Sequence, residues 1–324
     1  MRISFRALPL TAALSFIGGL AAAVPAGADE VDVYGRINLT LQDSDEFTND
    51  RVELRNNASR VGVKGELAID ANLKAIYQLE FGVNIDGDSS ADTFTHRNQF
   101  VGLEGGFGTV KVGRHDTALK EAQGDFDLFN DLEGDIAGAF NGENRLRNYI
   151  GYTSPALGEA IHITVNVFPG EDPDTGDDGV ADGASFSIDY ETDHLYLAIA
   201  HDRDLDGAGV RTSRLAGGYP LGPVQLMLLY QRTEAGAIEE DGVGVSLAWT
   251  HGRYVAKFQY LTSDLWLVDP QDDPLDNLYE SVLSVGLDRE FGERTRVFGF
   301  YTTGDIGGSG ANNDYLALGI EHQF

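Results

Sequence analysis

Residues 31–42 read VDVYGRINLTLQ, and their side chains alternate along the chain between two kinds. Val33, Ile37 and Leu41 fall on one face of an extended chain, and Arg36 and Asn38 fall on the other. Successive side chains of a β-strand point to opposite faces, so this stretch predicts a strand with one apolar side and one side fit for water.

The same alternation recurs to the last residue, where 314–324 repeat it. A soluble β-sandwich alternates as well, so the number of segments has to decide between architectures. We expect about 16 strands, at 31–41, 58–68, 72–84, 97–104, 108–114, 146–153, 160–168, 184–191, 194–202, 210–219, 223–232, 242–250, 253–263, 280–290, 294–303 and 314–324. Of these, 97–104 and 210–219 alternate least cleanly. The set predicts an all-β fold, an up-and-down antiparallel transmembrane β-barrel.

Connections of two lengths separate the segments. Short turns such as Thr192-Asp193 and His251-Gly252 alternate broadly with long connections rich in Asp, Gly and Asn. The long connections are expected at 43–57, 85–95, 115–144, 169–182, 263–279 and 304–313. In such barrels the short turns are periplasmic and the long loops external, which puts both termini on the short-turn side.

The N-terminus reads as a secretory signal peptide over residues 1–28. Arg2 and Arg6 precede an apolar stretch at 7–20, and Ala26-Gly27-Ala28 offers a cleavage site. No later stretch has the roughly 18 continuous apolar residues of a membrane helix. Residues 29–324 are therefore expected to form one transmembrane β-barrel domain.

Composition excludes several function classes. The chain has no Cys, which rules out disulfides and thiolate chemistry. Its 52 Asp and Glu against 23 Lys and Arg give a formal charge of -29, which disfavours nucleic acid as a partner. The acids either attract cations or are solvated loop residues with no specific partner.

Basic residues gather on the polar face of the early strands. They are Arg36, Arg60, Lys64, Lys74 and Arg147. If that face lines a lumen, these residues form a positively charged wall that faces the permeating ions. The alternative is that they are ordinary strand residues exposed to water.

The segment from His115 to Asn144 shows no clean strand pattern, and so long a stretch within a compact domain is usually functional or disordered. It combines acids with apolar residues, namely Asp125, Asp127, Asp131, Glu133 and Asp135 with Leu128, Phe129, Leu132, Ile136 and Phe140. Folded into the lumen, it would bury the apolar groups on the wall and face the arginines with its acids. We expect an inward-folded third external loop that forms a constriction with a transverse field.

Metal and catalytic motifs are weak. Asp202, Asp204 and Asp206 match the start of a calcium loop, but the twelfth position is Ser213 where a bidentate Glu is needed. The acidic stretch 172–179 is a similar candidate, with a solvated loop as the alternative. Zinc spacing, a phosphate loop and a nucleophile motif are missing. We expect no enzyme and no cofactor, with calcium at the acidic loops as the one possibility.

Several motifs together resemble the Gram-negative general porins. They are VDVYGR at 31–36, SRVGVKGE at 59–66, LKAIYQLE at 73–80, FVGLEGGFGTVKVGR at 100–114, RNYIGYTSP at 147–155 and the terminal Phe324. The likeness spans essentially the whole mature chain and is densest over its first 125 residues. It implies a 16-stranded barrel, a homotrimer and a third loop folded inward as an eyelet.

By position, the resemblance implies roles for single residues. Arg60, Arg97 and Arg147, with Arg36 close by, correspond to the basic cluster of the eyelet, and acids near Asp131, Glu133 and Asp135 correspond to its opposing side. The loop lacks the family's Pro-Glu-Phe-Gly-Gly stretch, which leaves open which acid faces the arginines. Phe324 corresponds to the C-terminal aromatic that the barrel-assembly machinery recognises.

The resulting hypothesis is a porin in the outer membrane of a Gram-negative bacterium, surrounded by outer-membrane lipid and lipopolysaccharide. It would pass ions and small hydrophilic solutes without chemical change. The acid excess predicts a mild cation preference, whereas the basic wall argues for anions. The alternatives are a channel specific for a sugar or organic ion, and a secreted carbohydrate-binding β-sandwich.

Overall fold

The computed structural model describes residues 30–46, 49–87, 92–171, 179–264, 279–307 and 310–324. The expected signal peptide, residues 1–28, lies outside these ranges. The strands are β1 (Glu30–Glu46), β2 (Asn49–Asn56), β3 (Arg60–Asp70), β4 (Leu73–Val83), β5 (Phe94–Gly105), β6 (Gly108–Asp116), β7 (Arg145–Thr153), β8 (Ile161–Phe168), β9 (Gly183–Thr192), β10 (Leu195–Arg203), β11 (Val210–Leu221), β12 (Val224–Ala235), β13 (Ile238–His251), β14 (Tyr254–Ser263), β15 (Ser281–Glu290), β16 (Thr295–Ile306) and β17 (Ala311–Gln323).

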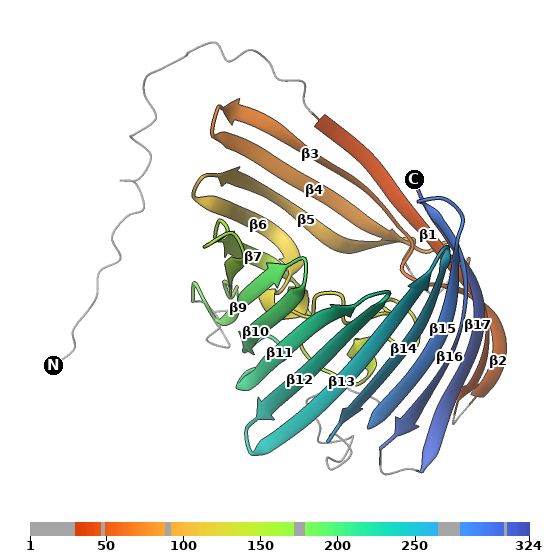
Figure 1. The fold of residues 1–324 in the computed structure, drawn as a ribbon. Helices are drawn as coiled ribbons and strands as arrows, with labels where there is room; N and C mark the ends of the chain where they lie inside the picture. Colours follow the sequence, from red (N-terminus) through yellow and green to blue (C-terminus); the bar gives the residue numbers. More distant parts are fainter. Residues whose placement is uncertain (1–29, 47–48, 88–91, 172–178, 265–278, 308–309) are drawn as a thin grey trace.

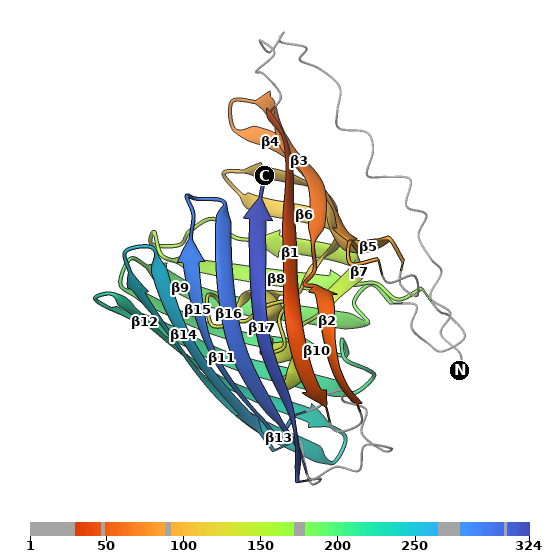
Figure 2. The same cartoon turned by 90° about the vertical axis from the view of Figure 1, so that its right-hand side faces the viewer.

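The strands form one closed ring of antiparallel neighbours (Figure 1). Each strand pairs with the next except β2, which pairs with β1 and not with β3, and the ring closes where Arg36 to Asp45 of β1 pair with Asp314 to Gln323 of β17. In Figure 2 these two strands run side by side up the front of the barrel. At the seam the Gly35 and Phe324 backbones exchange two hydrogen bonds of 3.0 and 3.1 Å. A single closed ring excludes the two packed sheets of a β-sandwich.

Seventeen labelled strands fill sixteen positions in the ring. Opposite β17, β1 pairs first with β3 over Glu30–Arg36 and then with β2 over Leu39–Glu46. Thus β2 and β3 are one strand interrupted at residues 57–59, where Ala58 has a positive φ of 48°. The expected barrel of about 16 strands is confirmed. The expected loop at 43–57 is wrong, because most of it extends the β1–β2 hairpin.

The two faces of the wall are inverted relative to a soluble protein. On β1, Asn38, Thr40 and Gln42 are almost completely buried, whereas Ile37 and Leu41 are 41% and 58% exposed. Large apolar side chains are exposed in the same way around the ring, which fits an outer surface that faces lipid. Among the described residues no helix is long and apolar enough to cross a membrane.

The segment at 117–144 connects β6 to β7 and carries the two short helices α1 (Ala118–Glu121) and η1 (Ile136–Gly138). Its apolar residues pack against buried side chains of the strands. Phe126 and Ile136 are fully buried beside Leu261, and Phe129 packs against β16 and β17. The segment is therefore fixed to the wall by burial of apolar surface.

Two glycines of β13 make room for this packing. A Cβ atom on Gly244 would lie 2.4 Å from the Phe126 ring, and one on Gly242 would lie 2.4 Å from the Phe140 ring. Both distances are too short for non-bonded carbon atoms. The absence of side chains at these positions lets two aromatic rings approach the sheet.

Replacing Gly244 with Val is expected to displace Phe126 and to lower the free energy of unfolding by about 1–3 kcal/mol. Chemical denaturation of the folded barrel in detergent measures this loss. The matched control is Val243→Ile on the same strand, because Val243 points outward and is half-exposed. Equal unfolding midpoints for the two variants would contradict the proposed fit.

Candidate functional site

Two arginines from neighbouring strands share one acid of the 117–144 segment. Arg36 of β1 and Arg60 of β3 are directly opposite each other in the ladder. Both guanidinium groups bind Oδ2 of Asp131. Burial alone would raise the pKa of Asp131, but Arg60 and Arg36 outweigh it and hold that pKa below its usual range.

Arg97 joins this cluster through Glu80. Arg97 Nε lies 2.7 Å from Glu80 Oε1, and Arg60 Nη1 lies 4.0 Å from the same oxygen. Tyr34 donates to the other oxygen of Glu80 at 2.9 Å. The structure thus brings Arg36, Arg60 and Arg97 together.

Arg145, and not the predicted Arg147, lines a cavity with the arginines of this cluster. Arg145 Nη2 is 3.0 Å from Asp116, and Arg145 lines a cavity of about 360 Å³ together with Arg60 and Arg97. Arg147 is exposed and is not one of the residues that line this cavity. A register shift between β6 and β7 falls at this point.

Lys64 and Lys74 lie apart from the arginine cluster. Lys64 Nζ is 3.5 Å from Asp32, and Lys74 Nζ is 2.7 Å from Glu66 and 3.0 Å from Glu104. These lysines form a separate group of ion pairs toward the β3–β4 turn.

The acids of the segment have different partners. Glu133 binds Arg55 at 2.5 Å and accepts a hydrogen bond from Gln42 at 2.9 Å, whereas Asp125 is exposed. Burial raises the pKa of Asp127 well above its usual range, with a further rise from Asp135, and burial also raises the pKa of Asp135. These two acids bind mainly the segment's own backbone and Gln259. Among the five acids predicted for the segment, Asp131 is therefore the one that binds Arg36 and Arg60.

Basic residues of the later strands extend the cluster and were missed by the sequence reading. Lys257 of β14 and Arg296 of β16 both bind Asp288, at 2.6 and 2.7 Å. With Arg36 they line a second cavity of about 450 Å³. Lys257 shares the polar parity of Gln259 and could have been found from the sequence. Arg296 shares its parity with two phenylalanines, Phe298 and Phe300, so the pattern does not mark its face as polar.

Arg214 of β11 fastens both ends of the segment to the wall. Its side chain is 0% exposed and binds Glu143 at 2.7 Å. Its Nη atoms also donate to the carbonyl oxygens of Leu119 and Asn141, and Gln231 accepts two further hydrogen bonds. Burial raises the pKa of Glu143, and the Arg214 charge opposes that rise.

The three aspartates of the calcium-like stretch do not converge. Asp202 is buried in the wall, Asp204 pairs with Arg203 at 3.2 Å, and Asp206 accepts a hydrogen bond from Asn144 at 2.8 Å. Within the described ranges, no group of three or more His, Cys, Asp or Glu side chains is placed to hold a metal ion. Most of the second candidate, 172–179, lies outside the described residues. Asp206 instead helps to anchor the end of the 117–144 segment.

The chain is similar to outer-membrane proteins and porins. It is 26% identical to the major outer membrane protein P.IB of Neisseria meningitidis serogroup A over 82% of this chain and 83% of that protein. The fold is similar to that of an anion-selective porin from Comamonas acidovorans, with a TM-score of 0.73 and 19% identity over 91% of this chain and all of the other. It is also similar to OmpT of Vibrio cholerae in a trimer form, with a TM-score of 0.64 and 15% identity over 92% and 100% of the two chains.

The family model described as Gram-negative porin matches residues 10–309. This match covers nearly the whole closed ring of strands. The chain therefore belongs to the Gram-negative porins, the channel-forming barrels of the outer membrane.

Proposed function

We propose that this porin is a passive, water-filled channel for ions and small hydrophilic solutes, narrowed by the 117–144 segment acting as an inward-folded third loop. Solutes are selected there by size and charge and leave chemically unchanged. The observation that carries the proposal is the bonding of one segment to distant strands. Asp131 binds β1 and β3, the Leu128 N–H donates to Gln259 of β14 at 2.8 Å, and Glu143 binds Arg214 of β11.

The charge at this constriction is local and differs from that of the whole chain. Arg36, Arg60, Arg97 and Arg145 face three acidic side chains, those of Asp131, Glu80 and Asp116. Asp127 and Asp135 contribute less negative charge, because burial raises the pKa of each. The constriction is therefore proposed to favour anions more than the formal charge of -29 suggests.

Reversal potentials in a KCl gradient across a planar bilayer test the proposal. We expect a linear current–voltage relation and an anion permeability at least equal to the cation permeability. Sugars of increasing size should reduce conductance up to a cutoff. A strong cation preference would contradict the proposed role of the arginines, and absence of conductance would contradict the channel itself.

A solute-specific channel for a sugar or organic ion is the second candidate. It is distinguished by conductance that saturates, or is blocked, as one solute is titrated. General diffusion predicts that conductance rises in proportion to salt concentration.

We further propose that the barrel assembles as a homotrimer among outer-membrane lipid and lipopolysaccharide. The trimer form of the OmpT relative supports this assembly. Phe324 is proposed as the residue recognised by the barrel-assembly machinery, and its 48% exposure leaves the ring accessible at the seam. Light scattering in detergent measures the oligomer, and deletion of Phe324 should reduce outer-membrane insertion in cells.

A further inference from the structure

Three arginines gather at the short-turn end of strands β13 to β16. They are Arg253, Arg289 and Arg294, and all three are exposed. Within the described ranges none of them forms an ion pair, whereas Arg232 on the outer face of β12 binds Asp241 at 2.6 Å. Their charges are therefore available to a partner outside the chain.

The backbone places the three arginines on adjacent elements. Arg289 is the last residue but one of β15, and Arg294 lies in the turn that follows. On the other side of β15, the Glu290 N–H donates to the Arg253 carbonyl oxygen at 2.9 Å. Figure 2 shows β15 ending at the same end of the barrel as the C-terminus.

Arg289 points away from the lumen. In the two ladders it lies opposite Tyr254 and Val297, which are 45% and 42% exposed, whereas its neighbour Asp288 is buried on the lumen side. The Arg289 guanidinium carbon lies 4.7 Å from the centre of the Phe291 ring and 5.8 Å from that of Tyr254. The two rings hold the guanidinium group in place without neutralising its charge.

The surroundings of Arg289 are those of a membrane interface. On the same outer face Leu287 and Val285 continue toward the middle of the strand and are half-exposed. Two strands away, the exposed Trp249 ring stacks on His251 with ring centres 5.7 Å apart. Aromatic rings of barrel proteins lie at the level of the lipid headgroups, and apolar residues beyond them face the acyl chains.

The acids nearest to Arg289 do not neutralise it. Glu290 shares the lumen-facing parity of Asp288 and lies opposite Arg296 in the ladder. Glu293 is exposed in the β15–β16 turn and forms no ion pair in the described part of the chain. Three guanidinium groups therefore leave a net positive charge on this part of the outer surface.

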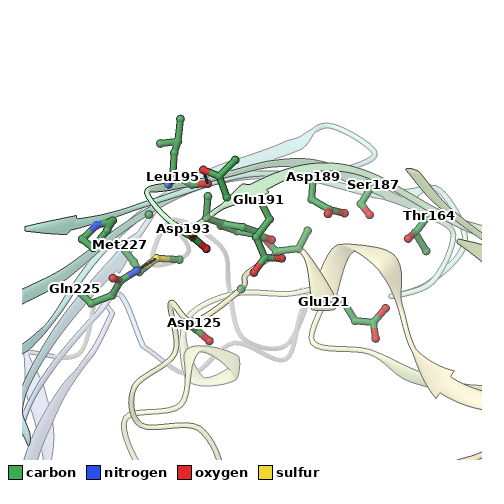
Figure 3. Close-up of a pocket in the computed structure, with 16 residues that line it drawn as sticks. Glu121, Asp125, Thr164, Ser187, Asp189, Glu191, Asp193, Leu195, Gln225 and Met227 are labelled. Carbon is green, nitrogen blue, oxygen red and sulfur yellow. Dashed lines mark hydrogen bonds between the residues drawn. The ribbon is translucent and has the colours of Figure 1, made fainter. Parts of the chain in front are cut away.

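The same end of the barrel is acidic elsewhere. Between the 117–144 segment and the β9–β10 turn, carboxylates of Glu121, Asp125, Asp189, Glu191 and Asp193 line a cavity (Figure 3). Such a surface repels anions, whereas the three arginines attract them. A guanidinium group binds a phosphate through two parallel hydrogen bonds, which makes phosphate the anion that this site fits.

We infer that this outward-facing site binds the phosphate of an anionic phospholipid in the periplasmic leaflet of the outer membrane. Arg289 donates to the phosphate oxygens, Arg253 and Arg294 add positive charge, and the acyl chains lie along Leu287 and Val285. The short turns of such barrels are periplasmic, which assigns the leaflet. The inference rests on the proposed placement of the barrel among outer-membrane lipid, and names the lipid and the residues that hold it.

The test titrates the mature barrel in detergent with dioctanoyl phosphatidylglycerol and counts bound lipid by native mass spectrometry. Arg289→Gln should raise the half-saturating lipid concentration about tenfold. Arg289→Lys should raise it about threefold, because the charge stays but the planar fork of donors is lost. Dioctanoylglycerol, which has the same chains without the phosphate, should not be retained.

The matched control is Arg211→Gln, which removes an outward-facing arginine that is 59% exposed at the other end of the wall. It should leave lipid binding unchanged. Equal losses in Arg211→Gln and Arg289→Gln would overturn the site, and so would retention of dioctanoylglycerol. Displacement of the lipid by an equal concentration of inorganic phosphate would show a site for free phosphate and overturn its assignment to lipid.

Two further measurements separate this site from other roles of the same face. Light scattering should give the same oligomer for Arg289→Gln and the wild type, and a changed oligomer would assign the face to a second copy of the chain instead. Both barrels should carry the same current in a planar bilayer, and an altered current would overturn the outward placement of Arg289. Loss of lipid binding alone leaves the channel proposal intact, whereas a wild-type barrel without current would overturn that proposal.

Discussion

Arg214→Gln is expected to loosen the 117–144 segment and to lower the free energy of unfolding by about 3–5 kcal/mol, the usual cost of leaving a buried charge without its partner. Glu143 would lose its ion pair, and the carbonyls of Leu119 and Asn141 would lose their donors. Both ends of the segment are released together. In single-channel recordings the variant should show frequent closures or unstable open levels, in addition to a lower unfolding midpoint.

The pH dependence of this variant has a defined sign. Burial already raises the pKa of Glu143, and removal of the opposing Arg214 charge raises it further. A raised carboxyl pKa in the folded state adds stability at low pH, and that stability is lost as pH rises through the folded pKa. The stability defect of Arg214→Gln should therefore be smaller at pH 5 than at pH 8.

Three variants separate the role of Arg214 from a general loss of charge. Arg211→Gln on the same strand removes a side chain that is 59% exposed and 3.8 Å from Glu234, which should cost under about 1 kcal/mol. Arg214→Lys should not restore the wild-type recordings, because an ammonium group lacks the planar fork of donors. Arg214→Gln/Glu143→Gln should recover part of the stability. Stable open levels in Arg214→Gln would refute the positioning role.

The ring of strands could be predicted from the sequence because lipid and water impose opposite demands on alternate residues. The weak alternation between apolar and polar residues at 210–219 has a physical cause. In β11 the buried face carries Val210, Arg214 and Ala216, and this face contacts the segment instead of open water. Where the segment covers the inner face of a strand, that face does not need polar side chains. The alternation between apolar and polar residues is then weaker.

The arginine cluster could be predicted only for strands in which side chains alternate regularly between the two faces. Arg36 and Arg60 lie on uninterrupted alternation, so strand parity assigns both to the polar face, and they are paired in the ladder. The β6–β7 ladder shifts register between Gly113 and His115, and Asn148 has a positive φ of 58°. This bulge puts Arg145 at the cavity, and simple counting from the strand pattern does not reveal it.

Two variants at Asp131 and its arginine partners should change the ion selectivity of the channel in opposite directions. Asp131→Asn removes the acid that Arg36 and Arg60 share, which should raise the anion-to-cation permeability ratio. Arg36→Gln/Arg60→Gln leaves Asp131 ionised with fewer partners and should lower the anion-to-cation permeability ratio. A unit charge about 7 Å from a permeating ion in water changes its energy by about 0.6 kcal/mol, or about threefold in permeability.

Reversal potentials in a KCl gradient measure both shifts, and pH supplies an internal check. Since the pKa of Asp131 is held below its usual range, Asp131 should stay ionised at about pH 4, and the difference in ratio between the wild type and Asp131→Asn should persist there. Lys64→Gln is the matched control, because Lys64 pairs with Asp32 away from the cluster. If both cluster variants moved the ratio in one direction, the field between Asp131 and the arginines could not be what selects the ions, and the constriction would have to act by size alone.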